Sequence, residues 1–224
     1  MSIRIGSEPA ALPSALVDKL RRVSFPTLGH YLEEGFADPG IARRAGTDRI
    51  VGRAITVRTT ATDSTMLHHA AGLVEAGDVV VVDTGGDVRH APLGQVVATA
   101  LSLRGAAGAV VDGSATDIDE IAPLGLPVYA RGLSMLTTKL HDIDGGSLNL
   151  PIVCGGVTVQ PGDVVLADSN GVLFASVPVL EAIIDTALED DAEEPDLIRE
   201  LAAGGRLGEL TGASATVARF AGAA

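Results

Sequence analysis

The sequence is poor in aromatic residues and in positive charge. It contains no Trp, two Tyr and four Phe, and its 16 basic residues face 29 acidic ones, which gives a net charge of −13. Nucleic-acid binding relies on basic patches and on aromatic platforms for stacking bases. We therefore expect no direct nucleic-acid partner, and for the same reason no acidic membrane surface as a partner.

Cysteine and long apolar runs are also scarce. Cys154 is the only cysteine, which excludes an intrachain disulfide and a zinc-binding cysteine cluster, and we expect it to be structural. No apolar run reaches the roughly 18 residues of a membrane span. The first eight residues lack the basic-then-apolar layout of a signal peptide. These absences predict a cytoplasmic protein.

What is present suits one domain of mixed α/β architecture over residues 1–224, with 46% hydrophobic residues. The core is expected at about 14–178, followed by a C-terminal helical segment at about 178–212 made of two helices, 178–190 and 195–203. Ten acidic and two basic residues between positions 181 and 210 carry −8 of the net charge.

The N-terminal part combines helical and strand-like spacing. Apolar residues recur every three or four positions after Ser14, which predicts a helix that Pro26 breaks and a short second helix from Thr27. Apolar and polar residues alternate from Ile50, as in a half-buried strand.

The middle of the chain alternates strands and helices. Short apolar runs typical of buried strands alternate with helical segments, at 64–75 (helix), 79–83 (strand), 93–104 (helix), 109–112 (strand), 118–124 (helix) and 127–130 (strand). This order predicts a parallel sheet with its functional loops along one edge. Short strands separated by Gly, Pro and Asn turns then predict a β-rich unit between 151 and 175.

Gly94 begins one predicted helix close to the Gly85-Gly86 loop. The amides of Gln95, Val96 and Val97 would then face the loop and could bind a carboxylate or an enolate oxygen. Many α/β turns contain such glycines without any ligand.

A second candidate site follows the strand at 109–112, where four acidic residues occur within nine positions: Asp112, Asp117, Asp119 and Glu120. Such a cluster suits a hard divalent cation. Alternatively, Thr116 or Asp117 caps the helix near Ile118, and the next two acids favour its positive end. Both interpretations can hold together.

Two further positions stand out less. His68 and His69 follow a possible helix cap at Asp63 or Ser64, but adjacent helical residues point about 100° apart and do not easily share a site. One packed and one exposed histidine is the simpler interpretation. Lys139, alone in a loop, is typical of a solvated side chain.

Several motifs together resemble the RraA-like family. They are the runs 77–94 (GDVVVVDTGGDVRHAPLG), 104–113 (RGAAGAVVDG), 126–132 (LPVYARG) and 155–172 (GGVTVQPGDVVLADSNGV). The family contains the regulator of ribonuclease activity A and the 4-hydroxy-4-methyl-2-oxoglutarate / 4-carboxy-4-hydroxy-2-oxoadipate aldolases. The resemblance runs from about residue 14 to 212.

The resemblance implies a β/β/α fold like the swivelling phosphohistidine domain, assembled as a homotrimer or homohexamer with the active site between subunits. It also implies the activity of a class II pyruvate aldolase, an enzyme that uses Mg²⁺ or Mn²⁺ and also decarboxylates oxaloacetate.

The aldolase signature is Asp, twenty residues, then Arg-Asp. Its last Asp falls on Asp117, the expected metal ligand, whereas Thr116 replaces the Arg and Gln95 replaces the first Asp. Glu194 is the nearest match to a glutamate that the family lends to the neighbouring subunit's metal site.

Two more residues complete the expected catalytic set with Thr116. Arg89 could supply the missing cation, and Asp87, or a glutamate of the next subunit, would position the water that shuttles a proton.

Three functions are compatible with these residues. The leading one is a divalent-metal lyase acting on a small 2-oxo acid. In the second, the exchanges at 95 and 116 re-tune the pocket for another carboxylic acid. In the third, the chain is a non-catalytic regulator whose acidic segment binds a basic protein partner.

Overall fold

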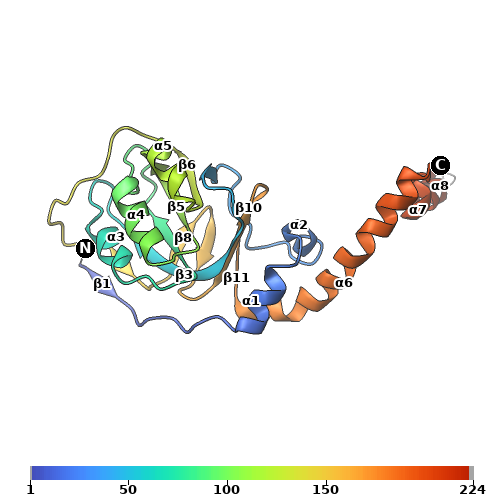
Figure 1. Cartoon of the computed structure of the whole chain (residues 1–224), viewed down its shortest axis with the longest axis horizontal. Coiled ribbons are helices and arrows are strands. Elements are labelled where there is room, and N and C mark those ends of the chain that lie inside the picture. The colour runs from blue at the N-terminus through green and yellow to red at the C-terminus, as the bar shows by residue number, and fades with distance from the viewer. Residues whose placement is uncertain (1, 222–224) are drawn as a thin grey trace.

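A mixed sheet of nine strands forms the centre of the molecule, in a computed structural model that describes residues 2–221 (Figure 1). Four of its strands run parallel in chain order: β3 (Ile50–Arg58), β4 (Asp78–Asp83), β5 (Gly108–Ala115) and β6 (Val128–Leu133). This confirms the predicted α/β core with a parallel sheet. The narrower assignment to the swivelling-type class stays a prediction.

Strand β3 is paired along both of its edges. β4 covers one edge, while β10 (Val164–Asp168) and β7 (Ser147–Leu148) share the other in antiparallel pairing. All residues of β3 except Arg58 are buried. The expectation of a half-buried strand was wrong here, because layers of structure cover both faces of the sheet.

The β-rich unit is present as predicted. Besides β10, the unit contains β8 (Ile152–Cys154), β9 (Val157–Val159) and β11 (Gly171–Ala175). Two further strands, β1 (Arg4–Ile5) and β2 (Ala42–Ala45), lie at the edges of the large sheet. β8 and β9 form a separate hairpin. Cys154 is fully buried in this unit, and burial raises the pKa of its thiol, which fits a structural role.

Helices cover the face of the sheet opposite the β-rich unit, and two of these helices are shorter than predicted. They are α3 (Thr65–Ala71), α4 (Gln95–Leu103), α5 (Ile118–Ile121) and the 3₁₀ turn η1 (Ala122–Leu124). α3 ends at Ala71 rather than Glu75. β5 continues to Ala115, where the sequence suggested a loop from Gly113, because β6 pairs with it as far as Leu133.

A third apolar layer lies over β10 and β11. It contains α1 (Ser14–Leu20), α2 (Phe25–Leu28) and the first half of α6 (Val177–Ala202). α2 begins before the predicted Thr27 because Pro26 lies in its first turn, where a missing backbone N–H costs nothing. Pro26 therefore helps to start a helix rather than only ending one.

The C-terminal region is one long helix where two were predicted. α6 runs for 26 residues and contains Pro195, where the sequence predicts the start of a second helix. A proline removes one hydrogen bond and costs about 3 kcal/mol in a helix interior, yet α6 continues across it.

Residues 188–221, which we call the arm, leave the core (Figure 1). The arm comprises the rest of α6 with α7 (Leu207–Leu210) and α8 (Ala213–Ala221), and none of its residues is buried. Within residues 2–221 no helix is both long and apolar enough to cross a membrane.

Candidate functional site

The loops after the four parallel strands form a small ladder at one edge of the sheet. Isolated parallel bridges join Asp63 to Lys139, Ala91 to Thr137, and Leu93 to Ala115. Paired segments lie about 4.8 Å apart, so the ladder places Lys139 about 10 Å, or two steps, from the segment that leads into Asp117. At the sheet edge that the sequence predicts to be functional, these bridges therefore fix the loops relative to one another.

A cleft of about 210 Å³ lies over these bridged loops. Its walls consist of Ser64, His68, Ala91, Pro92, Gly94, Val96, Val97, Thr116, Asp117, Thr137, Thr138, Lys139 and Leu140. Segments far apart in the chain thus bring together residues from the Gly94 region, the acidic loop, the histidine pair and the lysine loop. Its lining combines polar side chains, among them Asp117, His68 and Lys139, with apolar ones such as Val96, Val97 and Leu140.

Asp117 forms one end of the cleft. Its backbone is left-handed (φ 55°) at the N-cap of α5, but its carboxylate serves α4 instead: Oδ2 accepts the Gln95 N–H at 2.9 Å. Oδ1 accepts the Thr116 hydroxyl at 3.1 Å. Asp117 therefore stands at the N-cap position of α5 as predicted, but its side chain makes no cap hydrogen bond to that helix and caps α4 instead.

Gly94 is needed for this arrangement. A Cβ atom at that position would lie 2.5 Å from the Asp117 Oδ2 atom and 2.8 Å from the Thr116 Cγ2 atom. Only glycine allows the carboxylate to approach the start of α4 so closely. The Gln95 amide is consequently occupied by Asp117, and the carboxylate-binding role predicted for the amides of Val96 and Val97 stays a prediction.

Lys139 and His68 form the other end. Lys139 Nζ donates to the backbone oxygen and to the hydroxyl of Thr137, both at 3.0 Å, and it makes no ion pair within residues 2–221. The Thr138 hydroxyl donates to Ser64 Oγ at 2.8 Å, which fixes the loop against the start of α3. The sequence predicts a solvated Lys139, whereas the structure places it in the cleft; its position after a buried parallel strand is the signal for that place.

Asp87 and Arg89 do not line the cleft, and neither does the exposed side chain of Gln95. Asp87 Oδ1 accepts the backbone N–H groups of Arg89 and His90 at 2.8 Å, and Oδ2 lies 3.0 Å from His90 Nδ1. The hydrogen bonds from His90 and Arg89 lower the pKa of this carboxyl. In one chain Asp87 thus orders its own loop, and its predicted catalytic role remains a prediction, as does that of Arg89.

This pKa shift gives a testable pH dependence. A carboxyl with a lowered folded-state pKa stabilises the fold above its ordinary pKa and loses that effect as the pH falls through the folded value. We expect the wild type to melt above Asp87→Asn at neutral pH, with the gap closing as the pH falls below the ordinary carboxyl pKa and through the lowered pKa of Asp87. Thermal melts of both proteins across this range measure it, and a gap independent of pH would contradict the assignment.

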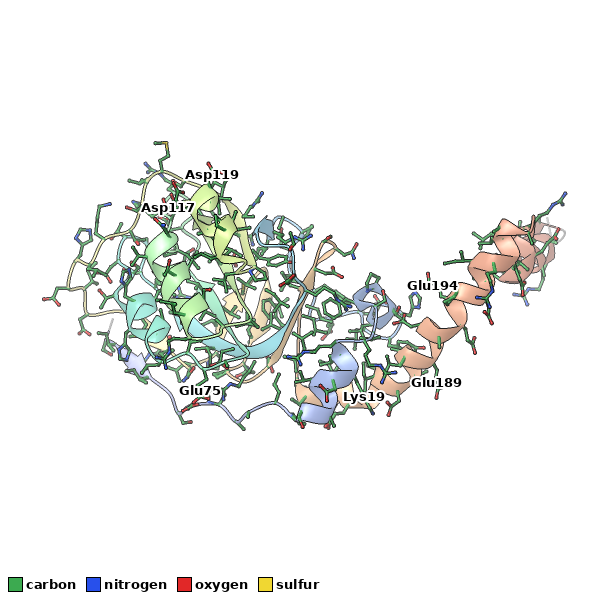
Figure 2. All side chains as sticks on the ribbon, viewed as in Figure 1. Lys19, Glu75, Asp117, Asp119, Glu189 and Glu194 are labelled. Atoms are coloured by element: carbon green, nitrogen blue, oxygen red, sulfur yellow. The ribbon has the colours of Figure 1, made fainter. Side chains whose placement is uncertain are left out.

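The acidic residues expected to share a cation do not gather. The Asp112 carboxylate pairs with Arg131 and accepts the Gly155 N–H at 2.8 Å. Glu194 lies on the arm, far from Asp117 in the same chain (Figure 2). No group of three or more His, Cys, Asp or Glu residues within 2–221 could hold a metal ion.

The donor set of the cleft nevertheless fits one kind of ion. Mg²⁺ usually keeps several waters and takes only one or two protein carboxylates together with substrate oxygens. Each oxygen of Asp117 accepts a single hydrogen bond in this structure and keeps further acceptor capacity. The cleft therefore suits a hard, largely hydrated cation rather than an ion enclosed by protein ligands.

Comparison with known proteins decides the family. A sequence profile of the RraA-like family, described as Aldolase/RraA, matches residues 15–174. The chain belongs to the RraA-like family. This confirms the resemblance carried by the glycine-rich motifs.

Two bacterial relatives of the family carry the name "Putative 4-hydroxy-4-methyl-2-oxoglutarate aldolase". The one from Halalkalibacterium halodurans is 34% identical over 147 residues, which cover 66% of this chain and 69% of that protein. The one from Ectopseudomonas mendocina is 35% identical over 152 residues, which cover 68% and 89%.

A solved structure of the family shares the fold over most of the chain. RraAS2 of Streptomyces coelicolor, described as an unusual member of the RNase ES inhibitor RraA protein family, is 27% identical with a TM-score of 0.72. The structural match covers 86% of this chain and 99% of the RraAS2 chain.

Proposed function

We propose that this chain is a carbon–carbon lyase of the class II pyruvate aldolase or oxaloacetate decarboxylase type, acting on a small 2-oxo acid. The observation that carries the proposal is the polarised cleft: a carboxylate at the start of α4 at one end, and Lys139 with His68 at the other. The names of the aldolase relatives support the same reaction class.

Each end of the cleft has a distinct task in this proposal. Asp117 would hold Mg²⁺ or Mn²⁺, which when bound supplies positive charge to the 2-oxo and carboxylate oxygens of the substrate. The amides of Val96 and Val97 would orient the carboxylate. Lys139 and His68 are placed to bind the departing part of the substrate or to transfer a proton.

A second copy of the chain completes the site in this proposal. Among residues 2–221, Asp117 is the only acidic residue that lines the cleft, whereas Glu194 is exposed on the arm. A homotrimer or homohexamer could bring Glu194 of one copy to the cleft of the next.

Pyruvate release from oxaloacetate tests the reaction. The purified chain with Mg²⁺ is expected to form pyruvate faster than Mg²⁺ alone at the same concentration. A rate equal to that of the metal alone would overturn the proposal.

Lys139 should control substrate affinity. A charge-assisted hydrogen bond contributes about 1.5–3 kcal/mol, or roughly 10- to 100-fold in binding. We expect Lys139→Gln to raise KM for oxaloacetate by that factor and Lys139→Arg to recover most of it, as steady-state kinetics would show. An unchanged KM in Lys139→Gln would place the substrate elsewhere.

Gln95 and Thr116, which replace the Asp and Arg of the aldolase signature, favour a variant of the same site that is adapted to another carboxylic acid. If the pocket merely prefers another carboxylic acid, the double variant Gln95→Asp/Thr116→Arg should raise oxaloacetate turnover, since the arginine adds a fixed cation beside Asp117. Turnover that stays near zero in the double variant would count against it.

The acidic C-terminal segment favours a second function, a non-catalytic regulator of ribonuclease activity. Residues 181–196 carry eight acidic side chains and no basic one, and RraAS2 is described as a member of the RNase ES inhibitor RraA protein family. Inhibition of a ribonuclease that is lost when these acids are neutralised would support this function. Unchanged ribonuclease activity, together with substrate binding in the cleft, would exclude it.

A further inference from the structure

A second cavity, of about 330 Å³, lies at the opposite edge of the parallel sheet from the cleft. Three of the residues that line it come immediately before parallel strands: Arg49 before β3, Ala107 before β5 and Pro127 before β6. Lys19 belongs to α1, which borders the cavity, and it lies across the core from Asp117 (Figure 2). No residue within 2–221 lines both hollows, so the two are separate.

The buried part of the cavity lining is apolar. Val51 is 8% exposed and Leu126 is 4% exposed, and both line the cavity beside the buried ring of Pro127. Ala107 and Leu124 are half-buried and continue this surface. A ligand with an apolar body therefore gains binding energy by covering it.

Close packing holds the turn before β3 beside this apolar surface. Gly46 is left-handed (φ 72°), and a Cβ atom at that position would lie 2.7 Å from the backbone nitrogen and Cα atoms of Pro127. Only glycine permits this approach. The turn consequently carries Asp48 and Arg49 to fixed places at the entrance of the cavity.

Arg49 is oriented before any ligand arrives. Its Nη2 atom donates to the Val23 oxygen at 2.5 Å, and its guanidinium carbon lies 3.8 Å from the centre of the Phe25 ring. Stacking on an aromatic face fixes the plane of a guanidinium group. The hydrogen bond to Val23 uses one of five N–H donors and leaves others for a ligand.

Arg21 supplies a second guanidinium group at the entrance, from the end of α1. Neither Arg21 nor Arg49 makes an ion pair within residues 2–221. Asp48 is the only acidic residue of the described chain that lines the cavity. Two cations against one acid favour an anionic ligand.

The combination of charge and apolar surface defines the ligand class. Guanidinium groups bind carboxylates and phosphates through paired hydrogen bonds. A free phosphate is hydrated on every side and gains nothing from the apolar wall, whereas an organic acid uses both parts of the cavity. We infer that this cavity is a second binding site, for a small organic carboxylate with an apolar body. The inference is independent of the reaction proposed for the cleft.

Benzoate binding to the full chain tests the inference. Benzoate joins a carboxylate to an apolar ring, benzamide has nearly the same shape without the charge, and inorganic phosphate is an anion without the ring. In saturation-transfer NMR titrations we expect benzoate to bind and benzamide to give no effect. Phosphate at the same concentration should not displace benzoate.

Three variants locate the bound benzoate. Arg21→Gln and Arg49→Gln should each raise its Kd about 10-fold or more, because each removes a charge-assisted hydrogen bond. Ser102→Phe keeps both arginines but places a ring in the cavity from the last turn of α4, where Ser102 is half-buried. This variant should abolish binding even if Arg49→Gln disturbs the packing on Phe25.

Two matched controls separate this site from general charge effects and from the cleft. Arg22 is exposed and adjacent to Arg21 but does not line the cavity, so Arg22→Gln should leave the Kd unchanged. Lys139→Gln removes the cation of the cleft and should also leave it unchanged. A loss of binding in either control overturns the inference. Failure of the wild type to bind benzoate, equal binding of benzamide, or full binding by Ser102→Phe does so as well.

Discussion

Replacing Asp117 by asparagine is expected to abolish oxaloacetate decarboxylation while leaving the fold intact. The asparagine oxygen can still accept the Gln95 N–H, so α4 keeps its cap. The variant loses the negative charge needed to hold a divalent cation, and such an ion contributes several kcal/mol to the transition state. A loss of at least about 10³-fold in turnover follows.

Two companion variants make the Asp117 experiment decisive. Asp117→Ala should lose activity equally and also about 1 kcal/mol of stability, because it removes the cap. Asp119→Asn alters an exposed acid at the start of the same helix and should leave both quantities unchanged. Full activity in Asp117→Asn would show that the carboxylate is only a helix cap.

Replacing Arg53 by methionine should cause a large loss of stability. Arg53 of β3 and Asp78 of β4 are buried register partners, with Nε–Oδ1 at 2.7 Å and Nη2–Oδ2 at 3.1 Å. The hydrogen bond to Asp78 raises the pKa of Arg53. Removing one member of such a pair leaves a buried, uncompensated charge and costs about 3–5 kcal/mol.

The double variant distinguishes charge from packing in this pair. Arg53→Met combined with Asp78→Leu removes both charges and should recover much of the lost stability, because apolar pairs often replace buried ion pairs at little cost. Urea unfolding of the wild type, the single variant and the double variant measures the effect. A double variant less stable than Arg53→Met would contradict this explanation.

The parallel core was predictable because its signals are local. Valine runs followed by glycine and acidic loops mark β4 and β5 without any knowledge of tertiary contacts, and the sheet order follows from the alternating strands and helices. The burial of both faces of β3 was not predictable, since it depends on layers contributed by distant parts of the chain.

The cleft was only partly predictable, for the same reason. Gly94 and Asp117 follow strand ends and were found, but the contact between Asp117 and the start of α4 depends on a left-handed residue that no pattern announces. Lys139 looked solvated because its bridge to Asp63 joins positions 76 residues apart. At Pro195, cooperative helix formation outweighed a local signal for a break.

Oxalate-dependent binding of Mn²⁺ tests the central claim, that Asp117 anchors a metal and 2-oxo acid site in this cleft. Calorimetric titration of Mn²⁺ in the presence of oxalate, an analogue of the pyruvate enolate, compares the wild type with Asp117→Asn and Asp119→Asn. We predict binding by the wild type and by Asp119→Asn, and none by Asp117→Asn. Equal binding by all three proteins, or no binding by the wild type, would contradict the claim.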